Sequence, residues 1–423
     1  MSDGPATQSL GLDFGTTNTA LAVARHGVPH RLAIEGSATT MPSAVFYGAF
    51  DGERAFGRDA FARYLDGGGG RLLRGIKTVL GTGLMHERTA AGGRILSFAD
   101  IIEALFAHVF RDLPDERGTR TLVVGRPVRF GTRDDAPGAG NDPEAFLGGV
   151  LERLGFRDIG FLYEPLAAAL AHERTATREE LALVVDIGGG TSDFSVVRIS
   201  PTRRDTRDRS GDVLSNTGAR IGGDRFDERF SLAVAMPELG YGTARKGTGH
   251  VQPGRIWSDL ATWHRINALY DRKTLDEIRM MVIDAADPER VRRLQGAVQG
   301  HCGHAIADAV ERAKAALSEA PATSLVLDVG AGTVEVEASR RSLEDALSDD
   351  IDRIRACALE AVRDAGVRPD DVQALFYTGG SSLVPLLRTR VGTAFPKARA
   401  VRENAFGSVA EGLSLEAERR ARA

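Results

Sequence analysis

Two segments of the chain share one pattern of apolar and polar positions. Apolar residues 10–12 and 20–24 flank a short polar turn at Gly15, and apolar residues 181–185 and 194–199 flank a second glycine turn. A short apolar run, a glycine-containing turn and a second apolar run predict a β-hairpin. Because the hairpin recurs far along the chain, without the short period of a solenoid, we expect two similar domains.

The intervening stretches alternate between strand and helix patterns, which predicts an α/β fold class. A proline at the first turn opens one of the helices, at residues 166–174. Residues 236–302 divide less clearly and suggest an inserted subdomain. Further strands are predicted at residues 120–128, 161–163 and 374–378, and helices at 142–154, 305–318, 348–365 and 381–390.

Composition limits the class of protein. The chain has 423 residues, of which 42% are hydrophobic and 26% charged, as in globular proteins. A net charge of −4 gives no reason to expect nucleic acid or membrane as a partner. Residues 1–8 lack the apolar stretch of a signal peptide, and no run reaches the roughly 20 apolar residues of a membrane span. With only Cys302 and Cys357, we expect a cytoplasmic protein with reduced thiols.

The two turns carry residue types suited to a polyphosphate. Glycine lets backbone N–H groups approach a phosphate closely, and threonine adds a hydroxyl. Asp13 and Asp186 end buried strands, where an unpaired carboxylate is costly and where Mg²⁺ would be a suitable counter-ion. Two ordinary hairpins are the alternative, but the repeated Asp-x-Gly followed by threonine favours a binding site. A third similar segment, residues 325–333, we expect to be a structural hairpin of an inserted part.

A set of short segments in order resembles the nucleotide-binding domain of the 70-kDa heat-shock chaperone (DnaK-like) family. The likeness covers nearly the whole chain and points to the short, YegD-like branch of the actin, hexokinase and heat-shock ATPase superfamily. Residues 164–169 and 311–314 in particular separate this family from actins and sugar kinases. The segments are the Asp13 hairpin, residues 39–43, 163–169, the Asp186 hairpin, residues 220–227, 311–318, and 378–381 with Pro385.

The resemblance implies an actin-like two-lobe fold of duplicated RNase-H-like domains that binds ATP or ADP with Mg²⁺. Lobe I would take residues 1–177, with an insert at about 40–114 and a C-terminal helix at about 402–418 packing back on it. Lobe II would take residues 178–396, with an insert at about 229–341. The ligand would lie in the cleft between the lobes.

The resemblance also implies residue roles. Asp13, Asp186 and Asp193 would hold the metal, and Glu164, Thr191 and Asp193 would act on the attacking water. The nucleotide would be bound by Gly15, Thr16, Thr17, Asn18, Gly188, Gly189, Gly190, Thr191, Gly222, Gly223, Glu311, Lys314, Ser318, Gly379, Gly380 and Ser381.

Three features depart from the family pattern. Phe61 follows residues 57–60, where the resemblance implies a phosphate-binding lysine; Lys77 and Arg63 are the candidates to replace it. Ala315 and Leu383 stand where two arginines would sandwich the adenine. We also expect no linker and no peptide-binding β-sandwich after residue 415.

From these observations we expect a slow ATP hydrolase that acts as a nucleotide switch in protein folding or assembly. The alternatives are a nucleotide-binding scaffold without turnover, a phosphotransferase of the sugar-kinase type, and an actin-like filament protein. We look for a protein partner at the lobe II insert, which holds Trp257 and Trp263. The alternative is that both tryptophans belong to the core.

Overall fold

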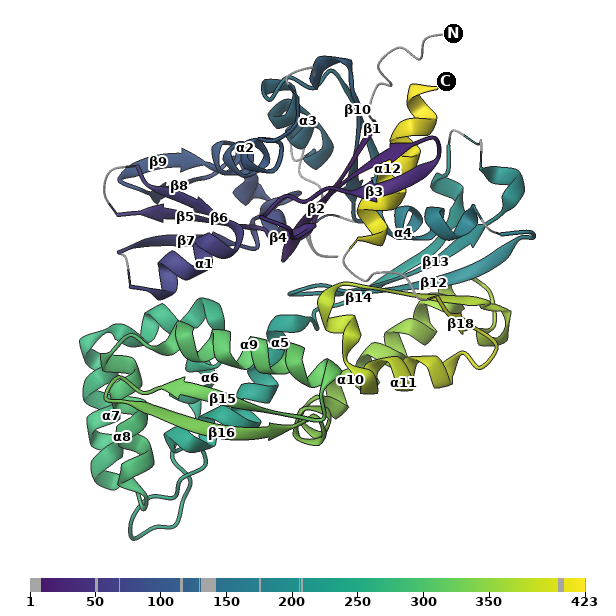
Figure 1. Ribbon diagram of the computed structural model, residues 1–423. Coiled ribbons are helices and arrows are strands. Elements are labelled where there is room, and N and C mark those ends of the chain that lie inside the picture. Colours follow the sequence, from purple (N-terminus) through teal and green to yellow (C-terminus); the bar gives the residue numbers. More distant parts are fainter. Residues whose placement is uncertain are drawn as a thin grey trace.

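The computed structural model describes residues 9–49, 52–67, 69–114, 117–128, 130, 142–174, 176–204, 206, 208–401 and 407–422. The first residues of the helix expected at about 402–418 lie outside these ranges. The chain folds into two α/β lobes (Figure 1). Lobe I carries the N-terminal strands and the yellow C-terminal helix, and lobe II carries the teal and green segments. None of the helices in the described ranges could cross a membrane.

The main sheets of the two lobes are built alike. In each, a three-stranded antiparallel meander is extended by two parallel strands on the side of its first strand. The strand orders are β11-β10-β1-β2-β3 and β18-β17-β12-β13-β14. The hairpin that recurs in the sequence therefore belongs to a sheet that is repeated in the two lobes. In lobe I the strands are β1 (Ser9–Phe14), β2 (Asn18–Arg25), β3 (Val28–Arg31), β10 (Thr121–Arg126) and β11 (Asp158–Tyr163), with β4 (Thr40–Pro42) also on β2. In lobe II they are β12 (Glu180–Ile187), β13 (Ser192–Ile199), β14 (Val213–Ala219), β17 (Ala374–Thr378) and β18 (Arg399–Ala400).

Two helices, α4 (Glu164–Glu173) and α12 (Ser408–Ala421), lie between the two sheets. Their apolar residues form one cluster with Val123 of lobe I and with Val184 and Phe376 of lobe II. The helices touch through their backbones, because a Cβ placed on Gly412 would lie 1.8 Å from the carbonyl oxygen of Ala167. The charged end of α12 is folded inward, since Glu416 is buried and pairs with Arg419 and Arg420.

Each lobe carries further elements outside its sheet. In lobe I these are β5 (Ala44–Gly48), β6 (Arg54–Phe56), α1 (Gly57–Leu65), β7 (Gly70–Arg74), β8 (Arg88–Ala91), β9 (Arg94–Ser97), α2 (Phe98–Val109) and α3 (Pro143–Arg153). In lobe II they are α5 (Gly223–Phe230), α6 (Arg255–Leu260), α7 (Arg272–Asp284), α8 (Pro288–Gln299), α9 (Gly303–Glu319), β15 (Ala322–Asp328), β16 (Thr333–Ser339), α10 (Arg340–Asp364) and α11 (Pro385–Ala394).

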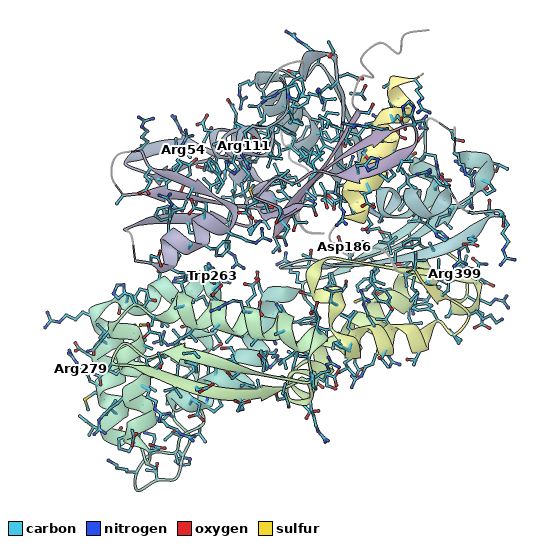
Figure 2. All side chains as sticks on the ribbon, viewed as in Figure 1. Arg54, Arg111, Asp186, Trp263, Arg279 and Arg399 are labelled. Carbon is cyan, nitrogen blue, oxygen red and sulfur yellow. The ribbon has the colours of Figure 1, made fainter. Side chains whose placement is uncertain are left out.

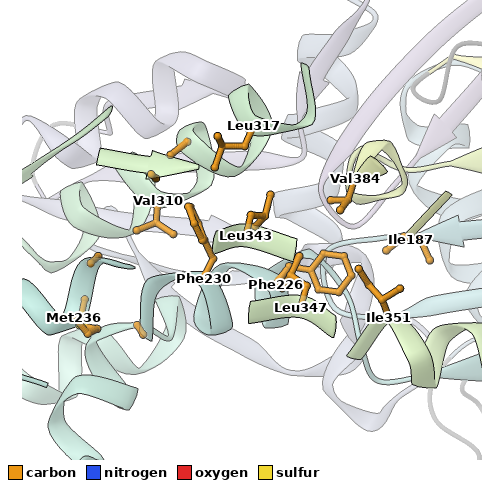
Figure 3. Close-up of a cluster of buried hydrophobic side chains, with 14 of the residues drawn as sticks. Ile187, Phe226, Phe230, Met236, Val310, Leu317, Leu343, Leu347, Ile351 and Val384 are labelled. Atoms are coloured by element: carbon orange, nitrogen blue, oxygen red, sulfur yellow. The ribbon is translucent and has the colours of Figure 1, made fainter. Parts of the chain in front are cut away.

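The core of lobe II joins these outer helices to the sheet. Phe226 and Phe230 of α5 pack among side chains from α9 and α10, as Figure 3 shows. Trp257 is fully buried in the same core, as the core interpretation of the tryptophans expects. The third lookalike forms the β15–β16 hairpin beside α9, away from the main sheets, as predicted for a structural hairpin.

Gly412 is a direct test of the α4–α12 packing. Replacing Gly412 with alanine forces the helices apart, so we expect the free energy of unfolding to fall by about 1–3 kcal/mol in urea titrations. Gly392 of α11 is the matched control, since a Cβ there meets no atom within 4 Å. Gly392→Ala should leave stability unchanged or raise it by up to about 1 kcal/mol. Equal effects of the two substitutions would contradict the close helix contact.

Candidate functional site

The turns of the two repeated hairpins meet where the lobes join. Each turn is closed by the same hydrogen bond: Gly15 N donates to Asn18 O, and Gly188 N donates to Thr191 O, both at 2.9 Å. A Cβ on Gly189 would lie 2.6 Å from Thr17 Oγ1. The two glycine-threonine turns therefore touch, and a side chain at position 189 would have to displace the Thr17 hydroxyl.

Each turn is held from behind by a segment that the sequence had singled out. Ser43 donates through its hydroxyl to Gly15 O at 2.7 Å and through its amide to Thr17 O at 2.8 Å. At the start of α5, Gly223 N donates to Gly188 O and Asp224 N to Gly189 O, at 2.9 and 2.7 Å.

These contacts occupy carbonyl groups of the second turn. Within the described chain, the N–H groups of Gly189 and Gly190 have no backbone acceptor. A Cβ on Gly190 would meet no atom within 4 Å. The turn therefore presents free donors to an open space, as binding of an anion requires.

Acidic side chains gather at the strand ends beside the turns. Burial raises the pKa of Asp13 to about 8, with Glu164 and Asp186 adding to the shift and Lys77 opposing it. Burial and the neighbouring Glu164 and Asp193 raise the pKa of Asp186 to about 7, although Thr378 donates a hydrogen bond to it. Asp13 and Asp186 keep part of their surface exposed, so the carboxylates face an accessible space.

Asp193 and Thr191 lie at the second turn. Burial raises the pKa of Asp193 above its ordinary value, even though Thr191 Oγ1 donates to its Oδ2 at 3.2 Å. Figure 2 labels Asp186, which lies near the junction of the two lobes. The residues predicted to hold the metal and to act on the attacking water thus lie close together.

Lys77 supplies the cation that the sequence seemed to lack. Its Nζ lies 2.5 Å from Glu164 Oε1, and both side chains are largely buried. Burial disfavours the ammonium, but Glu164, Asp13 and Asp186 outweigh it and hold the pKa of Lys77 above its ordinary value. Arg63 is not the substitute, since it pairs with Glu53 and Asp59 on the surface. Of the two candidates named from the sequence, Lys77 is therefore the one that lies in the acidic cluster.

The acidic cluster suits a metal ion that is held through water, and not one that several side chains bind directly. In the part of the chain that the structure describes, no three His, Cys, Asp or Glu side chains form a direct metal-binding set. Mg²⁺ commonly keeps several waters and uses one or two carboxylates with phosphate oxygens. Asp13, Asp186 and Asp193 fit this mode, because negative charge gathers here with Lys77 as the neighbouring cation.

A second group of predicted residues gathers beside α5. A Cβ on Gly223 would lie 2.7 Å from Ser381 Oγ and 3.6 Å from Lys314 Nζ. A Cβ on Gly222 would lie 2.5 Å from Gly189 O, which places this group next to the second turn. Gly379 adopts a φ of 76° with its Cα close to Ile187 O, a conformation that favours glycine. Gly380 follows it at the start of a short 3₁₀ turn.

Lys314 is paired across elements and not along its own helix. Its Nζ lies 2.7 Å from Asp227 Oδ1 of α5. Burial raises the pKa of Asp227 above its usual range, although Lys314 opposes the shift. Glu311 is an electrostatic neighbour of this pair, and Ser318 bonds back to Lys314 O at 3.2 Å. Asp227 was missed as a site residue, although it lies in the segment 220–227 that carried the resemblance.

Lobe I and lobe II also meet through a cluster of four aromatic side chains and one arginine, which we call the clasp. Its residues are Phe61, Tyr64, Arg74, Trp263 and His304. Phe61 and His304 pack edge-on to Trp263, with ring centres 5.7 and 4.7 Å away. The Arg74 guanidinium lies 4.6 Å from the Trp263 ring and also pairs with Asp224 at 2.7 Å. Tyr64 packs on His304, with ring centres 5.0 Å apart. Figure 2 shows Trp263 at this junction, so it does not belong to the lobe II core as Trp257 does.

Comparison with known proteins finds similarity to a chaperone family. The profile of the family described as Hsp70 protein matches residues 293–419. The chaperone protein HscA of Edwardsiella ictaluri is 28% identical over 434 aligned positions, and that of Pectobacterium atrosepticum 26% over 439. HscA of Salmonella newport is 27% identical over 436. Each alignment covers 97% of this chain and 58% of the relative, so the chain spans little more than half of their length.

Replacing Lys77 with methionine tests its electrostatic role. The substitution leaves Glu164 and Asp13 without their cation, so we expect a loss of stability on the order of 3 kcal/mol above pH 8. Because Lys77 lowers the raised pKa values of Asp13 and Asp186, its loss costs less at pH 6, where both are protonated. Urea unfolding at the two pH values measures the difference.

Lys397 is the matched control, since its pair with Asp370 is exposed. Lys397→Met should change stability by less than about 1 kcal/mol at either pH. A cost of Lys77→Met that does not grow with pH would contradict the assignment.

Proposed function

We propose that this chain, a relative of the Hsp70 family over nearly its whole length, binds Mg²⁺–ATP between its lobes and hydrolyses it slowly as a nucleotide switch in protein folding or assembly. The predicted family resemblance and the actin-like two-lobe fold are confirmed. The observation that carries the proposal is the contact of the two turns beside an acidic cluster. A role in folding or assembly rests on the chaperone relatives alone.

In this proposal the polyphosphate lies between the turns. The free N–H groups of Gly189 and Gly190 and the hydroxyls of Thr16, Thr17 and Thr191 would bind its oxygens. The nucleoside would extend toward Lys314, Glu311 and Ser381, since these lie on the far side of Gly222 and Gly223 from the acidic cluster.

Hydrolysis would use the acidic cluster and Lys77. Mg²⁺, held through water by Asp13, Asp186 and Asp193, would offset negative charge on the phosphates. Glu164 would orient a water and accept its proton, and its ion pair with Lys77 would hold the carboxylate in position. The presence of Lys77 removes one reason for a scaffold without turnover. Ala315 and Leu383 remain at the base positions, so we expect weaker base selectivity than an arginine sandwich would give.

Calorimetry with ATP, ADP and GTP, each with and without Mg²⁺, tests the binding proposal. We expect Mg²⁺-dependent binding of ATP and ADP, with GTP bound less than about tenfold more weakly. The pKa values of about 8 and 7 imply that Mg²⁺–nucleotide binding releases protons at pH 7 and tightens as pH rises to 8. Asp13→Asn with Asp186→Asn should abolish the Mg²⁺ dependence. Saturating Mg²⁺–ATP without heat or a shift in melting temperature would refute the proposal.

Glu164→Gln separates binding from turnover. We expect phosphate release in single-turnover assays to fall by about 10²-fold or more, while the dissociation constant changes little. Unchanged phosphate release would remove Glu164 from the reaction, and no release by the unaltered protein would favour the scaffold.

The clasp predicts slow exchange of nucleotide. Phe61→Ala removes one aromatic contact of Trp263, worth about 1 kcal/mol, so we expect nucleotide release about fivefold faster. Trp263 fluorescence should change on opening, because Trp257 is fully buried away from the junction. Tyr241→Ala is the control, since Tyr241 packs near Trp257 inside lobe II. If both variants release nucleotide like the unaltered protein, the clasp does not limit exchange.

A further inference from the structure

Helix α4 is attached to both lobes at its two ends. Its first residue, Glu164, pairs with Lys77 of lobe I at 2.5 Å. Its last residue, Glu173, pairs with Arg209 of lobe II through two hydrogen bonds, of 3.0 and 2.8 Å. Glu173 and Arg209 are both buried, with 2% and 5% of their surface exposed. Such a charge pair holds its geometry tightly, because neither partner can turn to water.

Arg204 and Ser200, from the same β13–β14 connection of lobe II as Arg209, add to this attachment. Arg204 donates to the carbonyl oxygen of Glu173 at 3.1 and 2.7 Å and to that of Ala176 at 2.7 Å. Ser200 N donates to Glu173 Oε1 at 2.9 Å. The last carbonyl groups of a helix lack partners within the helix and attract positive charge, so Arg204 caps α4 while Arg209 binds the Glu173 side chain.

The middle of α4 cannot take up movement between its ends. Ala167 touches the backbone of Gly412 in α12, and Leu166 and Ala168 are fully packed between the sheets. Nine residues of helix rise about 13 Å from Glu164 to Glu173. Because a packed helix moves as a rigid body, a displacement at its Glu173 end reaches Glu164.

We propose that Arg204, Arg209 and Glu173 are positioning residues. Through α4 they fix the position of Glu164, and so they couple the orientation of lobe II to the hydrolytic step. We call Arg204, Arg209 and Glu173 the α4 anchor. The expected effect on hydrolysis rests on the proposed function. The coupling of lobe II to the position of Glu164 rests on the α4 contacts alone.

The first test is Arg209→Gln in the full chain. We expect single-turnover phosphate release to fall about tenfold while the dissociation constant for Mg²⁺–ATP changes less than twofold. The binding constant should hold because the turns at Gly15 and Gly188 do not touch the anchor. Arg209→Lys keeps the charge and should recover part of the rate. Arg198→Gln is the matched control, and we expect normal turnover: Arg198 lies on β13 just before the same connection and pairs with the exposed Glu179 at 3.7 Å.

Arg209→Gln leaves two buried carboxylates, Glu173 and Asp212, without this cation, which destabilises the fold. The double variant Arg209→Met with Glu173→Gln removes both charges, keeps similar volumes and still breaks the anchor. It should fold, as judged by its melting transition, and show the same loss of turnover. A folded double variant with full turnover would overturn the inference.

A double-mutant cycle separates positioning from a general loss of structure. If the anchor acts through Glu164, adding Arg209→Gln to Glu164→Gln lowers turnover no further. If the two substitutions lower turnover by factors that multiply, the anchor acts elsewhere and the inference is refuted.

Amide hydrogen exchange tests the mechanical part without any turnover. Exchange at residues 168–170 of α4 should speed up in the anchor variants and stay unchanged in Arg198→Gln. An unaltered protein that fails to hydrolyse ATP would refute the proposed function; exchange that does not respond would refute the anchor.

Discussion

The contact between the turns of two hairpins is the constraint on which the site depends. Thr17 of lobe I and Gly189 of lobe II approach so closely that a Cβ on Gly189 would displace the threonine hydroxyl. Asp13 and Asp186 precede these turns on their strands, so the approach of the turns also brings like charges together. Burial and repulsion from neighbouring carboxylates, above all Glu164, raise the pKa values of both. Lys77 offsets part of this cost, and a metal-bound polyphosphate would offset the rest.

The arrangement of α4 and α12 explains how two lobes can share one site. The helices form a layer between the two sheets, and one apolar cluster runs from lobe I through this layer to lobe II. Glu164 stands at the end of α4 that faces the acidic cluster, while Glu173 at the other end is held by lobe II. The clasp joins the lobes a second time through Trp263. Movement of one lobe is therefore linked to the site at two separate places.

Much of the fold and part of the site could be predicted because they depend on local pattern. The hairpins, the helix opened by Pro165 and the third hairpin follow from apolar periodicity and turn residues. Asp13, Asp186, Glu164 and the glycines of the turns were named from short segments, and the structure places them together. Lys77 could not be assigned, because its neighbours in the sequence say nothing of a glutamate on a distant helix. Asp227 was passed over for the same reason, since its partner is Lys314 of α9.

The sequence by itself determined the repeated hairpins, the helix opened by Pro165 and the residue types at each turn, since these depend on contacts between near neighbours. Only the tertiary structure decided which lysine serves the acidic cluster, that Phe61 belongs to the clasp, and that the charged end of α12 is folded inward. Each of these is a meeting of side chains far apart in the chain. Such meetings are set by how the two sheets pack on α4 and α12, and no local pattern records that packing.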